Sequence, residues 1–488
     1  MAGPGDNNGA KPGSKEDLAP GTPRAGTALL VTLAMAQFMV VLDFTIVNVA
    51  LPSIQHGLHI ATTTLQWLVS AYAVTFGGFL LLGGRLADTF GQARLYRIGL
   101  SVFVLASISG GLATESSLLV ASRAVQGLGA ALLAPAGLSL LVTSWPDGPQ
   151  RSHALGVYGA VASAGFAAGA VIGGLLVEAS WRLVFFVNVP VGVVLLVVSR
   201  RLLPPDPPRI PRRLDVEGAL AATVGVAVLV LGVARAGQTL RPIQPGLLVG
   251  AALVLLVMFV VRERRTTSPL LDLDLLKDRG ILGANACLFT FGACNAGEVL
   301  LVTLYLQEGR GLSPLLTGLC FVPQAVGAFA LAGPASRLIP TLGPRRALAA
   351  GLSFALIALV GCALSVGHRS LVGLLFALFV MGIAARFVQI ASTLAGTRGP
   401  VAAKAEGSAS ALLTSSRQVG SALGVALLSA TLAIASGSES ARTETAMLTA
   451  AAFAFLGLLA TRVIRSGSAN PLAPRPEHLF QRHAGGLP

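Results

Sequence analysis

Fourteen long apolar segments fill most of this 488-residue chain, and they constrain its fold more than any other feature. An α-helix needs about 20 apolar residues to cross the hydrocarbon core of a bilayer, and its connection brings each crossing to roughly 30 residues. The chain is therefore long enough for fourteen crossings. Hydrophobic residues make up 54% of it and charged residues only 11%, a balance typical of membrane proteins. We expect an all-α integral membrane protein.

The apolar runs are continuous and rich in Leu, Ala, Val and Gly, whereas a membrane β-barrel needs short segments of alternating polarity. Helices therefore satisfy the backbone better. We place the spans at 26–50, 64–84, 95–113, 117–141, 154–177, 183–202, 217–235, 244–262, 280–304, 313–335, 346–366, 370–395, 408–435 and 443–463.

The net charge of +14 would suit a nucleic-acid partner if the basic residues formed a domain, but they stand singly at the ends of apolar runs. Most of them fall in loops on one side of the predicted topology, Arg97, Arg213 and Arg346 among them. By the positive-inside rule both termini are cytoplasmic in a multi-pass protein of the cell membrane. Residues 1–25 and 466–488 read as a disordered leader and tail, and the leader lacks the pattern of a secretory signal.

An internal repeat organises the spans. The residues Arg85, Leu86, Asp88, Thr89, Gly91 and Arg94 recur at constant offset as Arg337, Leu338, Pro340, Thr341, Gly343 and Arg346, with Pro in the Asp position. Such parallel repeats predict two homologous six-helix bundles, 26–203 and 280–465. Residues 204–279 then hold two linkers and an inserted helix pair, and 204–211 is a Pro-rich, stiff part of them.

Several motifs in the right order make the chain resemble the 14-helix drug:proton antiporter branch of the major facilitator superfamily. The resemblance covers about 26–465. Its motifs are Leu42 to Pro52 in the first span, Gly84 to Arg94 in the following cytoplasmic loop, Arg123, Gln126 and Gly127 in the fourth span, Gly165, Gly169, Gly173 and Gly174 in the fifth, and Trp181, Arg182, Phe185, Phe186, Asn188 and Pro190 at the sixth. One departure is Ala170, where the family usually has Pro.

The resemblance implies a proton-driven exporter that binds an amphipathic drug or an antibiotic between its bundles and expels it by alternating access, as a monomer. It also implies that Gly84, Arg85, Asp88, Gly91 and Arg94 form a cytoplasmic gating motif. The four fifth-span glycines would then seal the protein against proton leak. Arg-rich, Lys-poor usage fits an actinobacterial source, in which such exporters often confer resistance.

Asp43 and Arg123 lie at similar depths in the first and fourth spans, Asp43 about 10 Å below the outer end by helical rise. A buried carboxylate is costly unless it has a task or a partner. If the two residues meet, a conformational change that alters their contact would load or release a proton. The alternatives are a permanent structural ion pair and an Arg123 that snorkels outward.

The gating motif and the glycine motif each have a simpler interpretation. Asp88 would accept hydrogen bonds from an Arg or a helix N-terminus in one state, or else the motif is a turn with positive-inside residues. The glycines would seal the seam between the bundles, or they serve ordinary close helix packing.

Glu298 in the ninth span is a candidate second group for proton coupling, or else it marks the wet outer end of that helix together with Glu308. Arg386 and Arg417 fall about 15 Å from the inner surface by helical rise and suggest a cavity that tolerates neutral or anionic compounds. Either could instead pair with a polar neighbour or reach the cytoplasmic interface. The possible substrate cavity comprises Asn48, Gln126, Asn295, Arg386, Gln389 and Arg417.

Other functions fit less well. No nucleotide-binding loop is present, and neither the four Cys nor the six His have metal-ligand spacing, so we expect no cofactor, no metal and no enzyme activity. A proton-linked importer of a small solute and a non-transporting membrane sensor would share the fold and remain alternatives. A membrane enzyme, such as a lipid-modifying transferase, is the remaining class.

Overall fold

The computed structural model describes the chain from Pro23 to Ile464, apart from residue 61 and residues 146–147, 207–214, 237–242, 267–268, 272, 331–337, 340 and 398–405. Residues 1–22 of the predicted leader, most of the Pro-rich linker and the tail lie outside the described residues. The last three residues of the predicted leader, 23–25, are helical and begin the first helix, so the leader prediction is wrong for them. In the described part thirteen helices are long and apolar enough to cross a membrane, and a shorter apolar stretch spans Pro314–Ala330. The prediction of an all-α membrane protein is confirmed.

The first seven helices carry the predicted spans of the N-terminal half. They are α1 (Pro23–Leu58), α2 (Thr62–Phe90), α3 (Gln92–Gly111), α4 (Ser116–Ser144), α5 (Pro149–Ala179), α6 (Leu183–Phe186) and α7 (Asn188–Leu202). The predicted sixth span is divided at Val187, and α1 runs beyond the predicted residue 50 to Leu58, so Asp43 lies deeper in its helix than expected.

The middle segment and the C-terminal half are also helical. They comprise α8 (Val216–Ala236), α9 (Ile243–Arg265), η2 (Leu273–Lys277), α10 (Arg279–Leu304), the π-helical turn η3 (Tyr305–Gly309), α11 (Pro314–Cys320), α12 (Val322–Ala330), α14 (Pro344–Gly367), α15 (Leu371–Thr397), α17 (Glu406–Ile434), α18 (Glu439–Ala460) and η4 (Thr461–Val463). The predicted span 313–335 is broken at Phe321, and its last residues lie outside the described ones.

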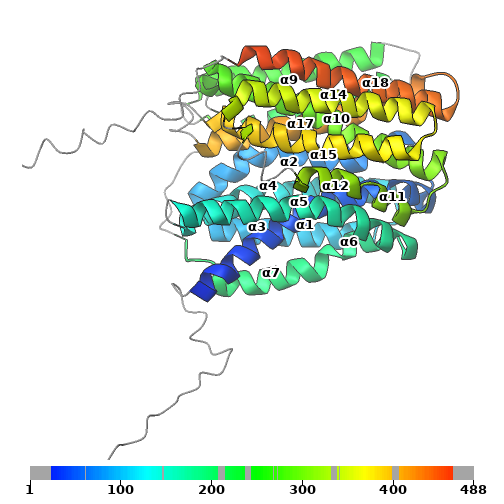
Figure 1. Ribbon diagram of the computed structural model, residues 1–488. Helices are drawn as coiled ribbons and strands as arrows, with labels where there is room; N and C mark the ends of the chain where they lie inside the picture. Colours follow the sequence, from blue (N-terminus) through cyan, green and yellow to red (C-terminus); the bar gives the residue numbers. More distant parts are fainter. Residues whose placement is uncertain are drawn as a thin grey trace, which may run out of the picture.

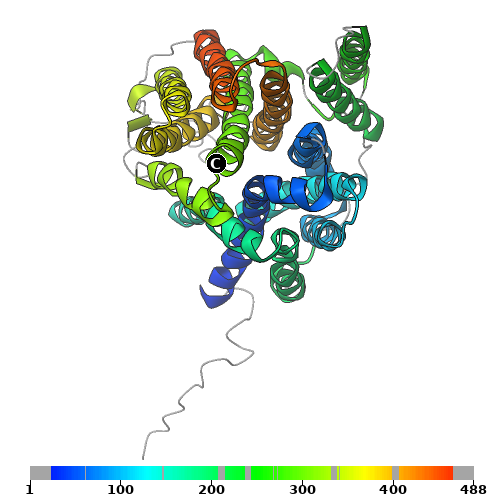
Figure 2. The same cartoon turned by 90° about the vertical axis from the view of Figure 1, so that its right-hand side faces the viewer.

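The helices run side by side along a common direction (Figure 1). Seen end-on, the helices of the two halves form neighbouring groups, with α8 and α9 at the edge beside α2 and α17 (Figure 2). The halves meet where α2 packs against α17, and where α5 packs against α11 and α12. This arrangement agrees with the predicted bundles and inserted pair, whose boundaries stay a prediction.

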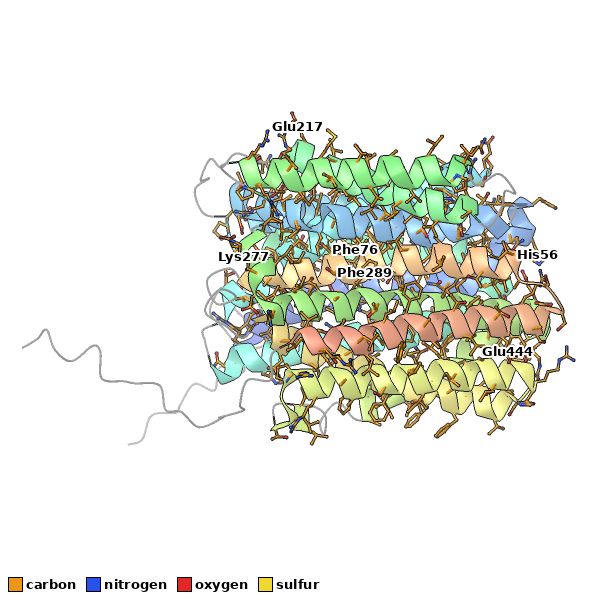
Figure 3. All side chains as sticks on the ribbon, turned by 90° about the horizontal axis from the view of Figure 1, so that it is seen from above. His56, Phe76, Glu217, Lys277, Phe289 and Glu444 are labelled. Carbon is orange, nitrogen blue, oxygen red and sulfur yellow. The ribbon has the colours of Figure 1, made fainter. Side chains whose placement is uncertain are left out.

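Ionisable residues near the ends of the helices lie at both ends of the molecule. Glu217 and Lys277 lie at one end, whereas His56 and Glu444 lie at the other (Figure 3). Helices that run between these two ends agree with a multi-span topology.

The internal repeat has a structural counterpart. Gly91 immediately before α3 has φ +101°, and Gly343 immediately before α14 has φ +77°. Glycine adopts this left-handed region without a steric penalty. Both loops therefore use a glycine to turn the chain into the next helix.

Candidate functional site

Asp43 lies at the centre of a buried polar network in the N-terminal half. It is fully buried in α1, and its Oδ2 is 2.5 Å from Nη1 of Arg123 in α4. Its Oδ1 accepts hydrogen bonds from Asn188 Nδ2 of α7 (2.8 Å) and from Gln126 Nε2 of α4 (3.1 Å). Three donors therefore stabilise the charged carboxylate in its buried position.

Arg123 is held on every side. Its Nε donates to the backbone carbonyl of Leu68 in α2 (2.9 Å), its Nη1 also donates to Gln126 Oε1 (2.9 Å), and its guanidinium lies 4.4 Å from the ring centre of Tyr72. A cation is attracted to an aromatic face at this distance. Arg123 is fully buried, so the alternative in which it snorkels to the interface is wrong.

The network reaches a fifth helix through Gln126, whose Nε2 donates to Ser107 Oγ of α3 at 2.8 Å. Gln126 therefore belongs to the Asp43 network and not to an open cavity, which corrects its predicted place. Asn188 was part of the sixth-span motif, but its contact with Asp43 was not foreseen. A polar amide at the start of an apolar span was the available signal.

Glu298 is a second fully buried carboxyl, in α10 of the other half. The Gln324 amide of α12 lies 3.4 Å from its Oε2, and that of Asn295 lies 3.5 Å away. Its Oε1 has no hydrogen-bond partner and no guanidinium or ammonium pairs with it among the residues that the structure describes. The alternative of a wet helix end is therefore wrong for Glu298.

The gating motif occupies the end of α2 and the turn into α3. Arg85 donates to the carbonyl of Pro269 at 3.0 Å, Gly84 is half-buried in α2, and Asp88 is exposed. The N-terminus of α3 is occupied by Asp206, whose carboxylate accepts from the backbone amides of Ala93 (2.8 Å) and Arg94 (3.0 Å). Sequence reasoning missed Asp206, because its segment and α3 are far apart along the chain, and the role predicted for Asp88 stays a prediction.

Gly91 makes room for that carboxylate, because a Cβ at its position would collide with Asp206. The turn into α3 thus holds the segment that follows α7.

The fifth-span glycines divide between two faces of α5. Gly165, Gly169 and Gly173 lie against the α1 backbone, within the same half, so a Cβ at any of them would meet α1. Gly174 instead lies against Pro314 and Leu315 of α11. Only Gly174 of the four therefore lies in the seam between the halves, which corrects the prediction for the other three.

Ala170 completes that seam. It is fully buried, and its backbone carbonyl lies close to Gly318 of α11, where a Cβ would collide with it. Small residues on both helices thus allow backbone-to-backbone packing.

The other predicted cavity residues belong to α1, α10, α15 and α17. Asn48 is buried in α1 and donates to the Phe44 carbonyl at 2.7 Å, and Asn295 lies beside Glu298. Arg386 and Arg417 are half-buried in α15 and α17, and Gln389 is exposed. Arg417 forms no ion pair with a described carboxylate.

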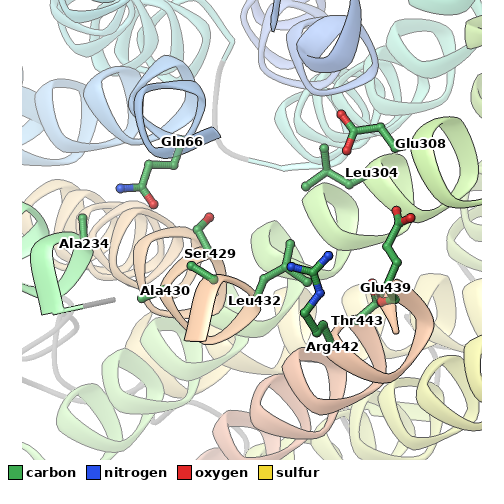
Figure 4. Close-up of a pocket in the computed structure, with 11 residues that line it drawn as sticks. Gln66, Ala234, Leu304, Glu308, Ser429, Ala430, Leu432, Glu439, Arg442 and Thr443 are labelled. Atoms are coloured by element: carbon green, nitrogen blue, oxygen red, sulfur yellow. Dashed lines mark hydrogen bonds between the residues drawn. The ribbon is translucent and has the colours of Figure 1, made fainter. Parts of the chain in front are cut away.

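A cavity of about 330 Å³ lies at the end of the molecule that is predicted to face outward. It is lined by ends of α2, α8, α10, η3, α17 and α18, with Gln66, Glu308, Glu439 and Arg442 among its polar residues (Figure 4). None of the six predicted cavity residues lines it.

The two halves also contact each other at this same end. The side chain of Gln307 donates to the Val49 carbonyl of α1 at 2.9 Å, and Leu300 and Leu304 of α10 share an apolar cluster with Leu51 and Ile54 of α1. The halves are therefore packed together at this end.

Comparison with known proteins places this architecture in a family. The model of the Major Facilitator Superfamily matches residues 33–425, which is most of the chain. The chain belongs to the major facilitator superfamily. Its membership agrees with the resemblance that the motifs indicated, and members of this family carry small molecules across membranes.

Several curated relatives of this major facilitator are named for antibiotics. It is 38% identical to the cephamycin export protein of Amycolatopsis lactamdurans, over 82% of this chain and 84% of that protein. It is 40% identical to the puromycin resistance protein of Streptomyces alboniger, over 83% and 81%. A multidrug resistance protein of Mycobacterium tuberculosis is 35% identical, over 83% and 75%.

A solved structure agrees on the fold. A crystal structure of a peptide transporter in complex with sulfate matches with a TM-score of 0.65 at 19% identity, over 90% of this chain and 95% of that one. At this identity the similarity shows the fold of this major facilitator and nothing about its substrate.

Proposed function

We propose that this chain is a proton-driven exporter of amphipathic drugs or of an antibiotic, and that it confers resistance. The observation that carries the proposal is the buried Asp43–Arg123 pair at the centre of a chain whose relatives are named for antibiotic export and resistance. A buried ion pair is rarely retained for stability alone, because desolvation offsets most of its Coulomb energy.

Proton coupling would follow from the geometry of the network. While Arg123, Gln126 and Asn188 all donate to Asp43, its charged form is stabilised. These donors come from α4 and α7, so a movement of α1 relative to them would remove the donors and favour a protonated Asp43. Arg123 would then neutralise the site again when the proton leaves.

In this conformation Glu298 would be protonated, whereas Asp43 would be ionised. An ionised carboxylate buried without a cation is costly, so we infer that Glu298 carries a proton in this conformation. Opening of the seam between α10 and α12, where Gln324 contacts it, would admit water and allow release.

The proposal also covers the membrane, the topology and the oligomeric state. We place the protein in the cell membrane with both termini in the cytoplasm, as a working monomer of two six-helix bundles, 26–203 and 280–465, joined by the α8–α9 pair. The end of the molecule that carries His56 and Glu444 would face outward (Figure 3), and the substrate would be a small organic molecule exchanged for protons. The gating motif and Gly174 would control closure of the two sides.

The test measures drug resistance in cells that express the protein. Compared with cells that lack it, cells with the wild-type protein should require a higher inhibitory concentration of at least one compound in a panel that includes puromycin, a cephamycin and lincomycin. Asp43→Asn should abolish this effect, because a neutral side chain cannot exchange a proton, whereas Asp274→Asn, on the exposed linker helix η2, should retain it. Resistance that survives in Asp43→Asn, or accumulation of drug in place of export, would contradict the proposal.

A further inference from the structure

Two buried carboxylates lie at the base of the inserted helix pair, away from Asp43 and Glu298. Asp215 immediately precedes α8, and Glu263 is in the last turn of α9. Their relative exposures are only 4% and 3%. Nothing in the proposed transport cycle uses either residue.

Each carboxylate has one oxygen bonded and one oxygen left over. Asp215 Oδ1 accepts from the backbone amide of Gly218 (2.9 Å) and from Arg262 Nε (2.9 Å), and Glu263 Oε2 accepts from the backbone amide of Leu271 (3.0 Å). The oxygens Asp215 Oδ2 and Glu263 Oε1 are buried and have no partner among the described residues.

The two unpartnered oxygens face the same small space beside Gly218. A Cβ at Gly218 would lie 2.5 Å from Asp215 Oδ2 and 3.1 Å from Glu263 Oε1. Buried acceptors without donors are uncommon and each requires an explanation. A shared ligand that donates a hydrogen bond would satisfy both.

The nearby cations do not balance both charges. Arg262 pairs with Asp215, but it is 44% exposed and also pairs with the exposed Glu217 of α8 at 2.8 Å. Arg85 of α2 is close enough to Glu263 for its positive charge to act on that carboxylate, but its guanidinium donates its hydrogen bond to the Pro269 carbonyl. No ion pair joins Glu263 to a described residue. One of the two buried negative charges therefore has no direct partner among the described residues.

We propose that Asp215 and Glu263 together bind one proton, as a carboxyl–carboxylate pair at the base of the α8–α9 pair. The proton forms an O–H bond on one of the two free oxygens and donates a hydrogen bond to the other, which removes one negative charge. Two buried carboxylates that share a site cannot both ionise without a large penalty. The inference does not depend on export, because this site lies outside the Asp43 network.

The Asp215–Glu263 pair lies beside the linker that follows α9, so the protonation of the pair affects how this linker is attached. Glu263 bonds the linker at Leu271, and Arg85 of the gating motif bonds the same linker at Pro269. Loss of the proton would add a buried charge between α9, this linker and the end of α2. The pair thus makes the attachment of the linker sensitive to pH at that end of the molecule.

The test is infrared spectroscopy of the purified full-length protein in lipid nanodiscs. At neutral pH the carbonyl band of protonated carboxyl groups should be weaker in Glu263→Gln than in wild type, because the shared proton is absent. Glu217→Gln, which changes an exposed carboxylate of the same cluster, should leave the band unchanged. An unchanged band in folded Glu263→Gln would overturn the proposal.

A second, independent measurement tests the same proton through the stability of the fold. The folded protein retains a proton that the unfolded chain releases above about pH 4, so this pair makes the melting temperature of wild type fall as pH rises further. Glu263→Gln should show a shallower fall. Equal slopes would contradict the proposal, as would a melting temperature that sodium ions raise in wild type alone, which would assign the site to a metal cation.

Discussion

At the scale of single residues, Asp43 and Arg123 depend on each other because both are fully buried. Their equal depth along two spans made the pair predictable, whereas the donors Asn188 and Gln126 were known only as motif residues. Which of them face Asp43 depends on the rotation of α4 and α7 about their axes. An apolar span carries almost no periodic signal for that rotation.

The pair predicts a specific pattern of stability. Arg123→Ala should destabilise the protein by about 3 to 5 kcal/mol, because it leaves the buried Asp43 charge without its cation. Adding Asp43→Asn should restore most of this loss, although transport stays absent. Thermal unfolding in detergent measures both, with the exposed Arg264→Ala as the control. If the double variant is less stable than Arg123→Ala, the two side chains are not coupled as the structure indicates.

At the scale of elements, several polar contacts lie where a connecting segment meets the end of a helix, as at the start of α3 and at the base of α8 and α9. Apolar length and loop charge predicted the spans well, but they could not place contacts made by the connecting segments. Asp206 and the Asp215–Glu263 pair were missed for this reason. Their partners are backbone amides or distant side chains, which have no signature in the sequence.

Asp206 makes a local prediction for α3. Asp206→Ala should destabilise the first turn of α3 by about 1 kcal/mol, as does the loss of a capping side chain. Faster hydrogen exchange of the Ala93 and Arg94 amides would report it, with Asp274→Ala as the matched control. Unchanged exchange at these two amides would show that water replaces the carboxylate without loss.

The seam between α5 and α11 makes a prediction about sealing. Gly174→Val should push Pro314 and Leu315 away and increase proton leak, because its Cβ would collide with the α11 backbone. Gly156→Val, at a position with open space around it, should not leak. Gly169→Val should destabilise packing on α1 without opening the seam. Leak is measured as decay of a pH gradient across proteoliposomes, and equal leak in all three variants would argue against a sealing role for Gly174.

At the scale of the whole molecule, the repeat and the family membership account for two halves that pack against each other through α2 and α17 and through α5, α11 and α12. The sequence predicted these halves because the loop motif recurs at constant offset, and the positive-φ glycines Gly91 and Gly343 give the repeat its physical basis. The cavity at the end predicted to face outward was not predictable in the same way. Its lining residues come from α2, α8, α10, η3, α17 and α18, which lie far apart along the chain.

The central claim is that proton movement through Asp43 drives export. Its most direct test is drug transport in proteoliposomes with an imposed pH gradient, with puromycin and a cephamycin as probes. We predict that wild type moves at least one probe against the direction of proton flow, and that a protonophore or Asp43→Asn stops this movement. Transport by Asp43→Asn at the wild-type rate, or transport in the same direction as the protons, would contradict the account.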